Sequence, residues 1–300
     1  MIVYNFGSIN IDHVYQVSHF VRPGETMTSN AYQQVLGGKG ANQSIALGRA
    51  NCGVKHVGSI AKNDVALLET LSASGVDTSL ITLGDVPTGH AIIQVNDEAE
   101  NAIVLFAGAN HQINEQQIDD VLSQADKSDW VLLQNETNNI ELIIKRAKHF
   151  GLLVAFNPAP MDAKLVKPLI NDIDLLIVNE VEAMDLCNAS IVEQAQQTLQ
   201  ENYPSLKIIL TLGRQGVRHI YKNDVIEVAA FNVKAIDTTA AGDTFIGYCL
   251  AGLQSSLPIE QVLRQACAAS AICVTQAGAS SAIPTLSQVT TFMENEHHDT

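Results

Sequence analysis

Two aspartates frame a run of small residues in the stretch AIDTTAAGDTFIGYCLAG, residues 235–252. Asp237 ends a strand-like segment, and Asp243 falls in the first turn of the apolar helix that we expect to follow. Small residues at a helix N-terminus leave backbone N–H groups open to an anion, and the helix dipole favours negative charge there. A carboxylate beside an anion site is electrostatically unfavourable unless it takes part in chemistry, so Asp243 is a candidate acid–base residue.

Three further stretches carry polar residues in patterns that fit ligand binding. Asn10 and Asp12 leave the first predicted strand on the same side, because strand residues two apart share a face. The turn GGKGAN, residues 37–42, opens a predicted helix, and NEVE, residues 179–182, follows a buried strand. Asn and Asp side chains beside a flexible Gly-Gly backbone form a set suited to binding several hydroxyl groups, as in a sugar.

These residues need a frame, and the chain alternates strand-like and helix-like segments for most of its length. WVLLQ, LLVAFNP, DLLIVN and KIILTLG are short apolar runs that end in polar, Gly or Pro residues. Near-continuous apolar strands separated by helices predict a largely parallel sheet covered on both faces. Ligands of such sheets bind outside the carboxyl ends of the strands, where Glu136, Asn157, Asn179 and Thr211 fall.

Two segments, about 12–36 and 88–108, break this alternation. Both are rich in β-forming residues, and in the second AIIQV and AIVLF flank the turn residues NDEAEN, which is typical of a hairpin. Because no helices follow these strands, we expect them to form a small separate sheet that acts as a lid over the site.

Composition limits the class of protein. The chain has 300 residues, of which 46% are hydrophobic and 16% charged, as in an ordered globular protein. A net charge of −15 argues against nucleic acid or an anionic membrane as a partner. Five cysteines without CxxC spacing, no signal peptide and no membrane-length apolar run predict a cytoplasmic protein. The P-loop, GxGxxG, HExxH and GxSxG motifs are absent.

The stretches GSINIDH, GGKGANQ, VNEVEA and DTTAAGDTF resemble, in order and spacing, the ribokinase family of carbohydrate kinases, also called the phosphofructokinase-B family. The resemblance spans the chain from Asn5 to about Pro284 and is especially close to the ribokinases proper. It implies a ribokinase-like three-layer α/β/α sandwich with a central, mostly parallel sheet and a small β-sheet lid. It also implies a single α/β domain over residues 1–300 and a homodimer formed through the lid sheets.

The resemblance assigns roles to the motif residues. Asp243 would take a proton from a terminal sugar hydroxyl as that hydroxyl attacks the γ-phosphate of ATP, and the N–H groups of Ala240, Ala241 and Gly242 would hold the developing charge. The residues implied in sugar binding are Asn10, Asp12, Gly38, Lys39, Asn42 and Glu136.

The family's nucleotide and cation sites carry over in the same way. The residues implied in ATP binding are Asn179, Glu182, Thr211, Gly213 and Gly216, with Glu182 organising Mg²⁺ through water. A K⁺ site is implied at Asp237, Thr239, Cys273, Gln276 and Gly278. The chain departs from the family at Ala282, where ribokinases offer a serine hydroxyl, and this departure weakens the expectation of K⁺ activation.

The function expected from these residues is ATP-dependent phosphorylation of a pentose, with D-ribose converted to D-ribose 5-phosphate as the first choice. Deoxyribose, a nucleoside or another furanose remain as alternative substrates. A non-catalytic sugar- or nucleotide-binding protein ranks below these, because Asp243 and the glycine turn are both intact. An NAD-dependent oxidoreductase is disfavoured, because the glycine fingerprint of dinucleotide-binding folds is missing.

Overall fold

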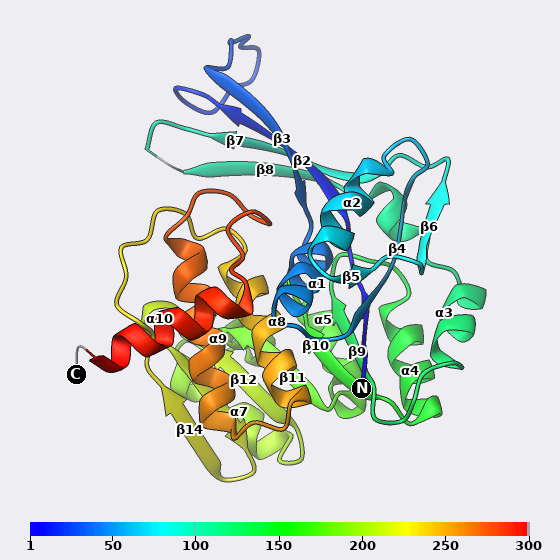
Figure 1. Cartoon of the computed structure of the whole chain (residues 1–300), viewed down its shortest axis with the longest axis vertical. Helices are drawn as coiled ribbons and strands as arrows, with labels where there is room; N and C mark the ends of the chain where they lie inside the picture. The colour runs from blue at the N-terminus through cyan, green and yellow to red at the C-terminus, as the bar shows by residue number, and fades with distance from the viewer. Residues whose placement is uncertain (99, 299–300) are drawn as a thin grey trace.

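The protein is built around a ten-stranded sheet. A computed structural model describes residues 1–98 and 100–298; residue 99, which falls in the predicted lid segment, and residues 299–300 lie outside it. The strands of this main sheet are β1 (Val3–Phe6), β4 (Val54–Ala61), β5 (Val76–Asp77), β6 (Ile81–Gly84), β9 (Trp130–Gln134), β10 (Leu153–Asn157), β11 (Leu175–Asn179), β12 (Lys207–Thr211), β13 (Val217–Tyr221) and β14 (Asp224–Val228). Their order is β14-β13-β12-β11-β10-β9-β1-β4-β5, and β6 also pairs with β4 (Figure 1).

The pairing in this sheet is mostly parallel, as the alternation of strands and helices predicts. All pairs among β1, β4, β5, β6, β9, β10, β11 and β12 are parallel. The pairs β12-β13 and β13-β14 are antiparallel, because short turns join these strands where helices join the others.

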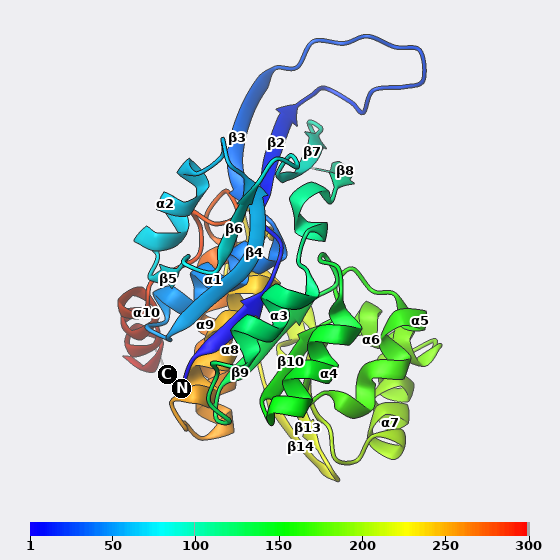
Figure 2. The ribbon, with the colours of Figure 1, turned by 90° about the vertical axis from the view of Figure 1, so that its right-hand side faces the viewer.

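Helices cover both faces of the sheet. The α-helices are α1 (Lys39–Arg49), α2 (Ala66–Ala73), α3 (Glu115–Leu122), α4 (Ile140–Phe150), α5 (Ala163–Val166), α6 (Glu180–Cys187), α7 (Val192–Asn202), α8 (Ala241–Gln254), α9 (Ile259–Val274) and α10 (Leu286–His298), and the 3₁₀-helices are η1 (Gly108–His111), η2 (Lys167–Asp172) and η3 (Gly213–Gln215). Figure 2 views the layers from the side, with α1, α2, α9 and α10 on one face and α3 to α7 on the other. The predicted three-layer α/β/α sandwich is confirmed. No helix in the described part of the chain combines the length and apolar character that a membrane crossing requires.

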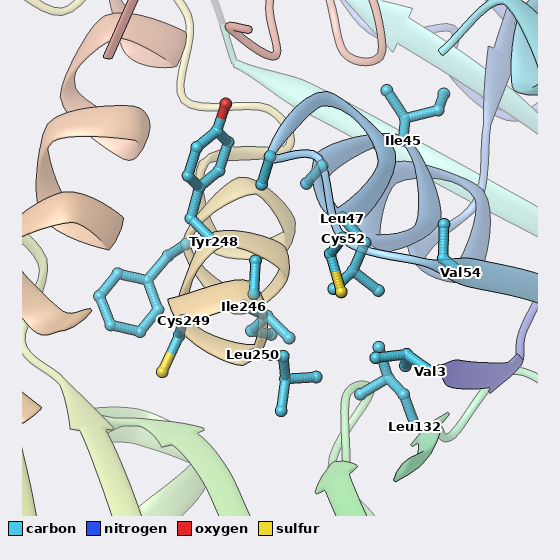
Figure 3. Packing of buried hydrophobic residues seen from close by; sticks show 14 of the residues in the cluster. Val3, Ile45, Leu47, Cys52, Val54, Leu132, Ile246, Tyr248, Cys249 and Leu250 are labelled. Atoms are coloured by element: carbon cyan, nitrogen blue, oxygen red, sulfur yellow. The ribbon is translucent and has the colours of Figure 1, made fainter. Parts of the chain in front are cut away.

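Strand side chains alternate between two hydrophobic cores, one on each face of the sheet. On β9, Trp130 and Leu132 join the first core, whereas Val131 and Leu133 join the second. Figure 3 shows the first core, where apolar side chains of α1 and α8 meet Val3 and Leu132 from the sheet. The sheet therefore holds α1 and α8 firmly, and both of these helices carry predicted site residues.

A separate four-stranded sheet projects from one end of the main body (Figure 1). This lid sheet contains β2 (Asn10–Gln16), β3 (Ala31–Gly37), β7 (Gly89–Val95) and β8 (Asn101–Phe106), in the order β3-β2-β7-β8. The small separate sheet is thus confirmed, and β7 and β8 pair antiparallel as the predicted hairpin. One detail differs from the prediction. Because the chain leaves the main sheet at Phe6, Asn10 and Asp12 belong to β2 and not to the first strand.

Helices α1 and α8 pack closely enough for side chains near their N-termini to touch. A Cβ atom on Gly247 of α8 would lie 2.4 Å from the Cβ atom of Ala46 on α1, so only glycine allows this approach. At the other end of the same interface, Asn42 and Gln43 of α1 reach Asp243 of α8. The glycine in α8 therefore sets the distance across which the site is assembled.

Candidate active site

The predicted base, Asp243, lies at the meeting point of α1 and α8. Its side chain is 8% exposed and falls in the first turn of α8. Asn42 donates from Nδ2 to Asp243 Oδ2 at 3.1 Å, and Gln43 donates from Nε2 to Asp243 Oδ1 at 2.9 Å. Both donors hold the side chain in place, and a carboxylate held in this way is a group that can accept a proton. The fold thus brings a predicted sugar-binding residue into direct contact with the predicted base, 201 positions away.

The acidic residues expected to bind sugar hydroxyls lie beside each other at the base of the lid sheet. Burial, and then the charge of Glu136, raise the pKa of Asp12 from 3.8 to about 6. Burial also raises the pKa of Glu136, although Lys39 and the hydroxyl of Ser8, which donates to Glu136 Oε2, oppose this effect. Two neighbouring carboxylates of this kind accept hydrogen bonds from hydroxyl groups.

Lys39 balances the negative charge of the site. Burial lowers its pKa, but the carboxylates of Asp243, Glu136 and Glu182 outweigh burial and raise it overall. Its backbone N–H also donates to Glu136 Oε2 at 3.1 Å. Lys39 therefore stays charged among three carboxylates, at the N-terminus of a helix, where a transferred phosphoryl group would add further negative charge.

The Gly-Gly turn before α1 is required by space and by backbone conformation. A Cβ atom on Gly37 would lie 1.9 Å from Oδ2 of Asp12, so the Asp12 carboxylate occupies the room that any side chain would fill. Gly38, the residue before α1, has a φ of +92°, which side-chain-bearing residues rarely adopt. The turn thus lets the Asp12 carboxylate lie directly against the backbone.

Two site residues were missed at the sequence level. Asn110, in η1, donates from Nδ2 to Asn10 Oδ1 at 2.7 Å and accepts from the backbone N–H of Ile9 at 2.8 Å. Asn110 therefore orients the Asn10 side chain. Ser8 likewise holds Glu136. Ser8 lies within the GSINIDH stretch and Asn110 follows the predicted hairpin, but their partners are 128 and 101 positions away, and no local pattern signals such contacts.

The predicted anion site lies at the start of α8. Ala240 adopts a left-handed conformation with a φ of +59°, and α8 begins at the next residue. The N–H of Ala241 donates to the carbonyl of Thr238 at 3.3 Å, within the turn. Helix geometry leaves the N–H groups of Gly242 and Asp243 without an acceptor in their own helix. These two groups are the donors available to an anion at the helix N-terminus.

The predicted nucleotide residues lie at the carboxyl ends of two neighbouring strands, β11 and β12. Asn179 pairs with Thr211 in the sheet register, and Gly213 and Gly216 follow with φ values of +53° and +109°. Asn179 and Glu182 form a capping box at the start of α6, with two bonds of 2.9 Å. This cap holds Asn179 and Glu182 together, and Glu182 Oε2 accepts the N–H of Asn179 in it.

The fit of Glu182 to Mg²⁺ follows from its surroundings. Burial raises the pKa of Glu182 overall. The charge of Lys39 lowers this pKa and the charge of Asp243 raises it. Within residues 1–98 and 100–298, no group of three or more His, Cys, Asp or Glu residues is arranged to hold a metal ion. A lone carboxylate suits Mg²⁺, which keeps several waters and binds through one or two carboxylates and substrate phosphates.

The two predicted halves of the K⁺ site are joined by Asp237. Its Oδ1 accepts from the N–H and the hydroxyl of Thr239 at 2.9 and 2.7 Å, and its Oδ2 accepts from the N–H of Gly278 at 2.9 Å. Burial raises the pKa of Asp237, but these bonds outweigh burial and lower it overall. Cys273 also approaches the Thr239 carbonyl through its Sγ atom, at 3.7 Å. The Asp237 carboxylate therefore holds Thr239 and Gly278, one residue from each half of the predicted site, close together.

Ala282, where the family offers a serine, is 1% exposed and brings no polar atom to this loop. Tyr248 donates from its hydroxyl to the carbonyl of Pro284 at 2.9 Å and so ties α8 to the same loop. Arg49 donates to the carbonyls of Ser280 and Ile283. The loop that ends the predicted cation site is thus held by side chains of α1 and α8. Gln276, the remaining predicted ligand, donates its N–H to the carbonyl of Cys273 at 3.2 Å.

Comparison with known proteins decides the family. Residues 3–286 match the pfkB family of carbohydrate kinases. The chain belongs to this family. It is similar to the ribokinase of Haemophilus influenzae, at 37% identity over 96% of this chain and 97% of that protein. It is also similar to the deoxyribokinase of Salmonella typhimurium, at 28% identity over 96% and 97% of the two chains.

A solved structure leads to the same family. The structure of Arabidopsis thaliana ribokinase complexed with ribose and ATP superposes with a TM-score of 0.85, at 25% identity, over 98% of each chain. As a pfkB carbohydrate kinase, the protein is an ATP-dependent sugar kinase. The predicted family and enzyme class are thereby confirmed.

Proposed function

We propose that this pfkB kinase phosphorylates D-ribose at its terminal hydroxyl and releases D-ribose 5-phosphate. The observation that supports the proposal is the contact between Asn42 and Asp243, because it joins a residue proposed to bind the sugar to the proposed base. The similarity to ribokinases supports ribose among the pentoses. The buried Asn42 Oδ1, which has no hydrogen-bond partner among the described residues, is an acceptor suited to a sugar hydroxyl.

In the proposed reaction, Asn10, Asp12 and Glu136 hold the sugar through its hydroxyl groups at the base of the lid sheet. Asp243 accepts the proton of the terminal hydroxyl, whose oxygen forms a bond to the γ-phosphorus as the bond to the β-phosphate oxygen of ATP breaks. The N–H groups at the start of α8 and the Lys39 ammonium stabilise the charge on the transferring phosphoryl group. Phosphoryl transfer depends mainly on positioning and charge stabilisation, which these groups supply.

On the nucleotide side, we propose that Thr211, Gly213 and Gly216 border ATP and that Asn179 and Glu182 hold Mg²⁺ through water. When bound, Mg²⁺ neutralises phosphate charge. K⁺ is proposed at the backbone carbonyls near Asp237, with activation weakened by Ala282. Exchange of K⁺ for Na⁺ in the kinase assay tests the proposed K⁺ site.

The proposal extends to assembly and location. The lid sheet exposes apolar side chains, namely Tyr32, Ile92, Ile103, Val104, Leu105 and Phe106. Exposed apolar patches of this kind mark protein contacts, which supports a homodimer through the lid sheets. We also propose one functional domain over residues 1–300 and a cytoplasmic location, where the five free cysteines would remain reduced.

Light scattering over a range of protein concentrations tests the dimer. The expected result is a dimer mass that falls to the monomer mass in Val104→Lys, because the charge would have to be buried in the interface. A monomer at every concentration in the native protein would reject the dimer.

The decisive experiment for the reaction measures ATP turnover against ribose, deoxyribose, other sugars and nucleosides, with Mg²⁺ present. The expected result is a preference for ribose, with kcat about 10²- to 10⁴-fold lower in Asp243→Asn, as for the loss of a general base. The exposed Asp120→Asn on α3 serves as the matched control and should keep native turnover. Preference for deoxyribose would favour the function named for the Salmonella relative. Native turnover in Asp243→Asn would reject Asp243 as the base.

A further inference from the structure

A continuous chain of buried polar side chains leads from the far side of α1 to Asp243. Its members are His56 on β4, Ser44 on α1, Asn5 on β1, Gln134 on β9 and Gln43 on α1. All five are 0% exposed. Buried polar groups cost free energy unless they are satisfied, so five of them in one line across the first core require an explanation.

Each hydrogen bond near the start of the chain has a direction that its neighbours determine. The Gly7 carbonyl can only accept, so His56 Nε2 donates to it at 3.0 Å. Burial lowers the pKa of His56 to about 4, so the ring is neutral and its Nδ1 accepts from the Ser44 hydroxyl at 2.8 Å. The Ser44 oxygen in turn accepts from Asn5 Nδ2 at 2.8 Å. The direction set at His56 is therefore passed to Asn5.

The direction continues through the two glutamines. Gln134 Nε2 donates to Asn5 Oδ1 at 3.0 Å and to Gln43 Oε1 at 2.7 Å. Because Gln43 Oε1 accepts, Gln43 Nε2 points the other way and donates to Asp243 Oδ1 at 2.9 Å. The chain thus ends with an N–H group aimed at the carboxylate of the base.

A second contact fixes the Gln43 amide independently. Asn157 donates from Nδ2 to the carbonyl of Ile177 at 3.0 Å, so its Oδ1 is free to accept, and it accepts the other hydrogen of Gln43 Nε2 at 3.2 Å. With Oε1 and both amide hydrogens of Gln43 engaged, rotation of this side chain would break three bonds. The arrangement leaves Gln134 Oε1 without a partner among the described residues. One acceptor is therefore left unsatisfied while the donor toward Asp243 is kept.

We propose that Gln43 is a positioning residue for the base: its locked amide fixes the rotation of the Asp243 carboxylate so that the second oxygen, beside Asn42, faces the sugar hydroxyl. This inference rests on the proposed role of Asp243. The other charged groups that act on this region are Lys39, Glu136 and Glu182. Replacement of Gln43 removes none of these charges, so they act alike in the native protein and in the variant.

The first test replaces Gln43 by methionine, which keeps the length of the side chain and removes the donor. The expected result in Gln43→Met is a kcat about 10- to 100-fold lower, with KM for ribose and for ATP within about threefold of native, because a misplaced reacting group slows chemistry without removing a binding contact. Gln117→Met on α3 is the control, since Gln117 is a half-buried glutamine amide outside the site, bonded to the carbonyl of Leu80 at 3.3 Å. It should keep native kcat.

The second test uses Gln43→Glu, which also applies if the methionine variant does not fold. The new carboxyl reproduces the donor only while it holds a proton, and once ionised it places a like charge beside Asp243. We expect kcat of Gln43→Glu to fall with rising pH where native kcat does not. A native kcat and a native pH profile in this variant would overturn the proposal, as would a loss confined to KM in Gln43→Met.

Turnover of Asp243→Asn and of Gln43→Met, measured together, distinguishes the role of the base from the role of Gln43. If Asp243→Asn keeps native turnover, the proposed base fails and the role of Gln43 fails with it. If Asp243→Asn is inactive while Gln43→Met keeps native kcat, the base stands and only the positioning role is rejected. A lower melting temperature with unchanged kcat in Gln43→Met would also reject it, because that result is the signature of a structural contact alone.

Discussion

One contribution to destabilisation by acid should come from the fully buried histidine His56. The ring lies within the first core, where Ser44 and the Gly7 carbonyl occupy its two nitrogens. Burial lowers the pKa of His56 from 6.5 to about 4, because the charged ring would lose its hydration. In the unfolded chain the same ring takes up a proton near pH 6.5, so the unfolded state binds more protons between these two values. Stability is therefore present above pH 6.5 and is lost as the pH falls toward 4.

The magnitude follows from the separation of the two pKa values. At about 1.4 kcal/mol per unit, a shift of this size corresponds to roughly 3 kcal/mol lost by pH 4, of which about 1 kcal/mol is lost by pH 5.5. The measurement is best made between pH 7.5 and roughly 5.5, because the sequence pI of about 4.9 favours aggregation at lower pH.

Urea denaturation of native protein and His56→Gln at several pH values measures this contribution. Other groups titrate in both proteins, so the quantity of interest is the difference between their unfolding free energies at each pH. We expect the advantage of the native protein to shrink by about 1 kcal/mol across the window. For the control His111→Gln, at an exposed position, the difference in unfolding free energy from the native protein should not change with pH. A difference between native and His56→Gln that does not change with pH would refute the argument that His56 is held neutral by burial.

Two further predictions concern the site. Gly37→Ala should raise KM for the sugar roughly 10-fold with little change in melting temperature, because the new Cβ meets the Asp12 carboxylate and not the backbone; an unchanged KM would contradict this. Asp237→Asn should lower the melting temperature at neutral pH, because it weakens the bonds to Thr239 and Gly278. Since the pKa of Asp237 is lowered on folding, the native advantage should disappear as the pH falls below about 4, and calorimetry at two pH values checks the sign.

The fold was predictable because its signals are local. Apolar runs such as WVLLQ alternate with helical patterns, and this rhythm indicates parallel strands with covering helices. The hairpin of β7 and β8 was likewise readable from alternating residues around a polar turn. The boundary between β1 and β2 was not predictable, because polar and apolar residues are interspersed without a break from Asn5 to Asp12. Only the lid pairing of Asn10 with Gly37 and Gly89 shows where the second strand begins.

The motif residues of the site were also predictable, whereas the residues that support them were not. Asp243 and Asn42 stand out because small or glycine residues surround them in the sequence. Gln43, at the end of the GGKGANQ stretch, and Gln134, at a strand end, look like ordinary polar residues. Their importance arises from contacts across 200 and 91 positions, which depend on how α1 and α8 pack on the sheet. Long-range side-chain contacts of this kind leave no periodicity in the sequence.

The attachment of the lid sheet has a consequence for engineering. The register places Asn10 opposite both Gly37 and Gly89, so the inner end of the sheet is part of the proposed sugar site, while Asp243 is anchored in the main body. A substitution at the far end of β2 or β3 that tilts the lid sheet would move Asn10 and Asp12 relative to Asp243. Selectivity for the sugar is therefore adjustable from positions that never touch it.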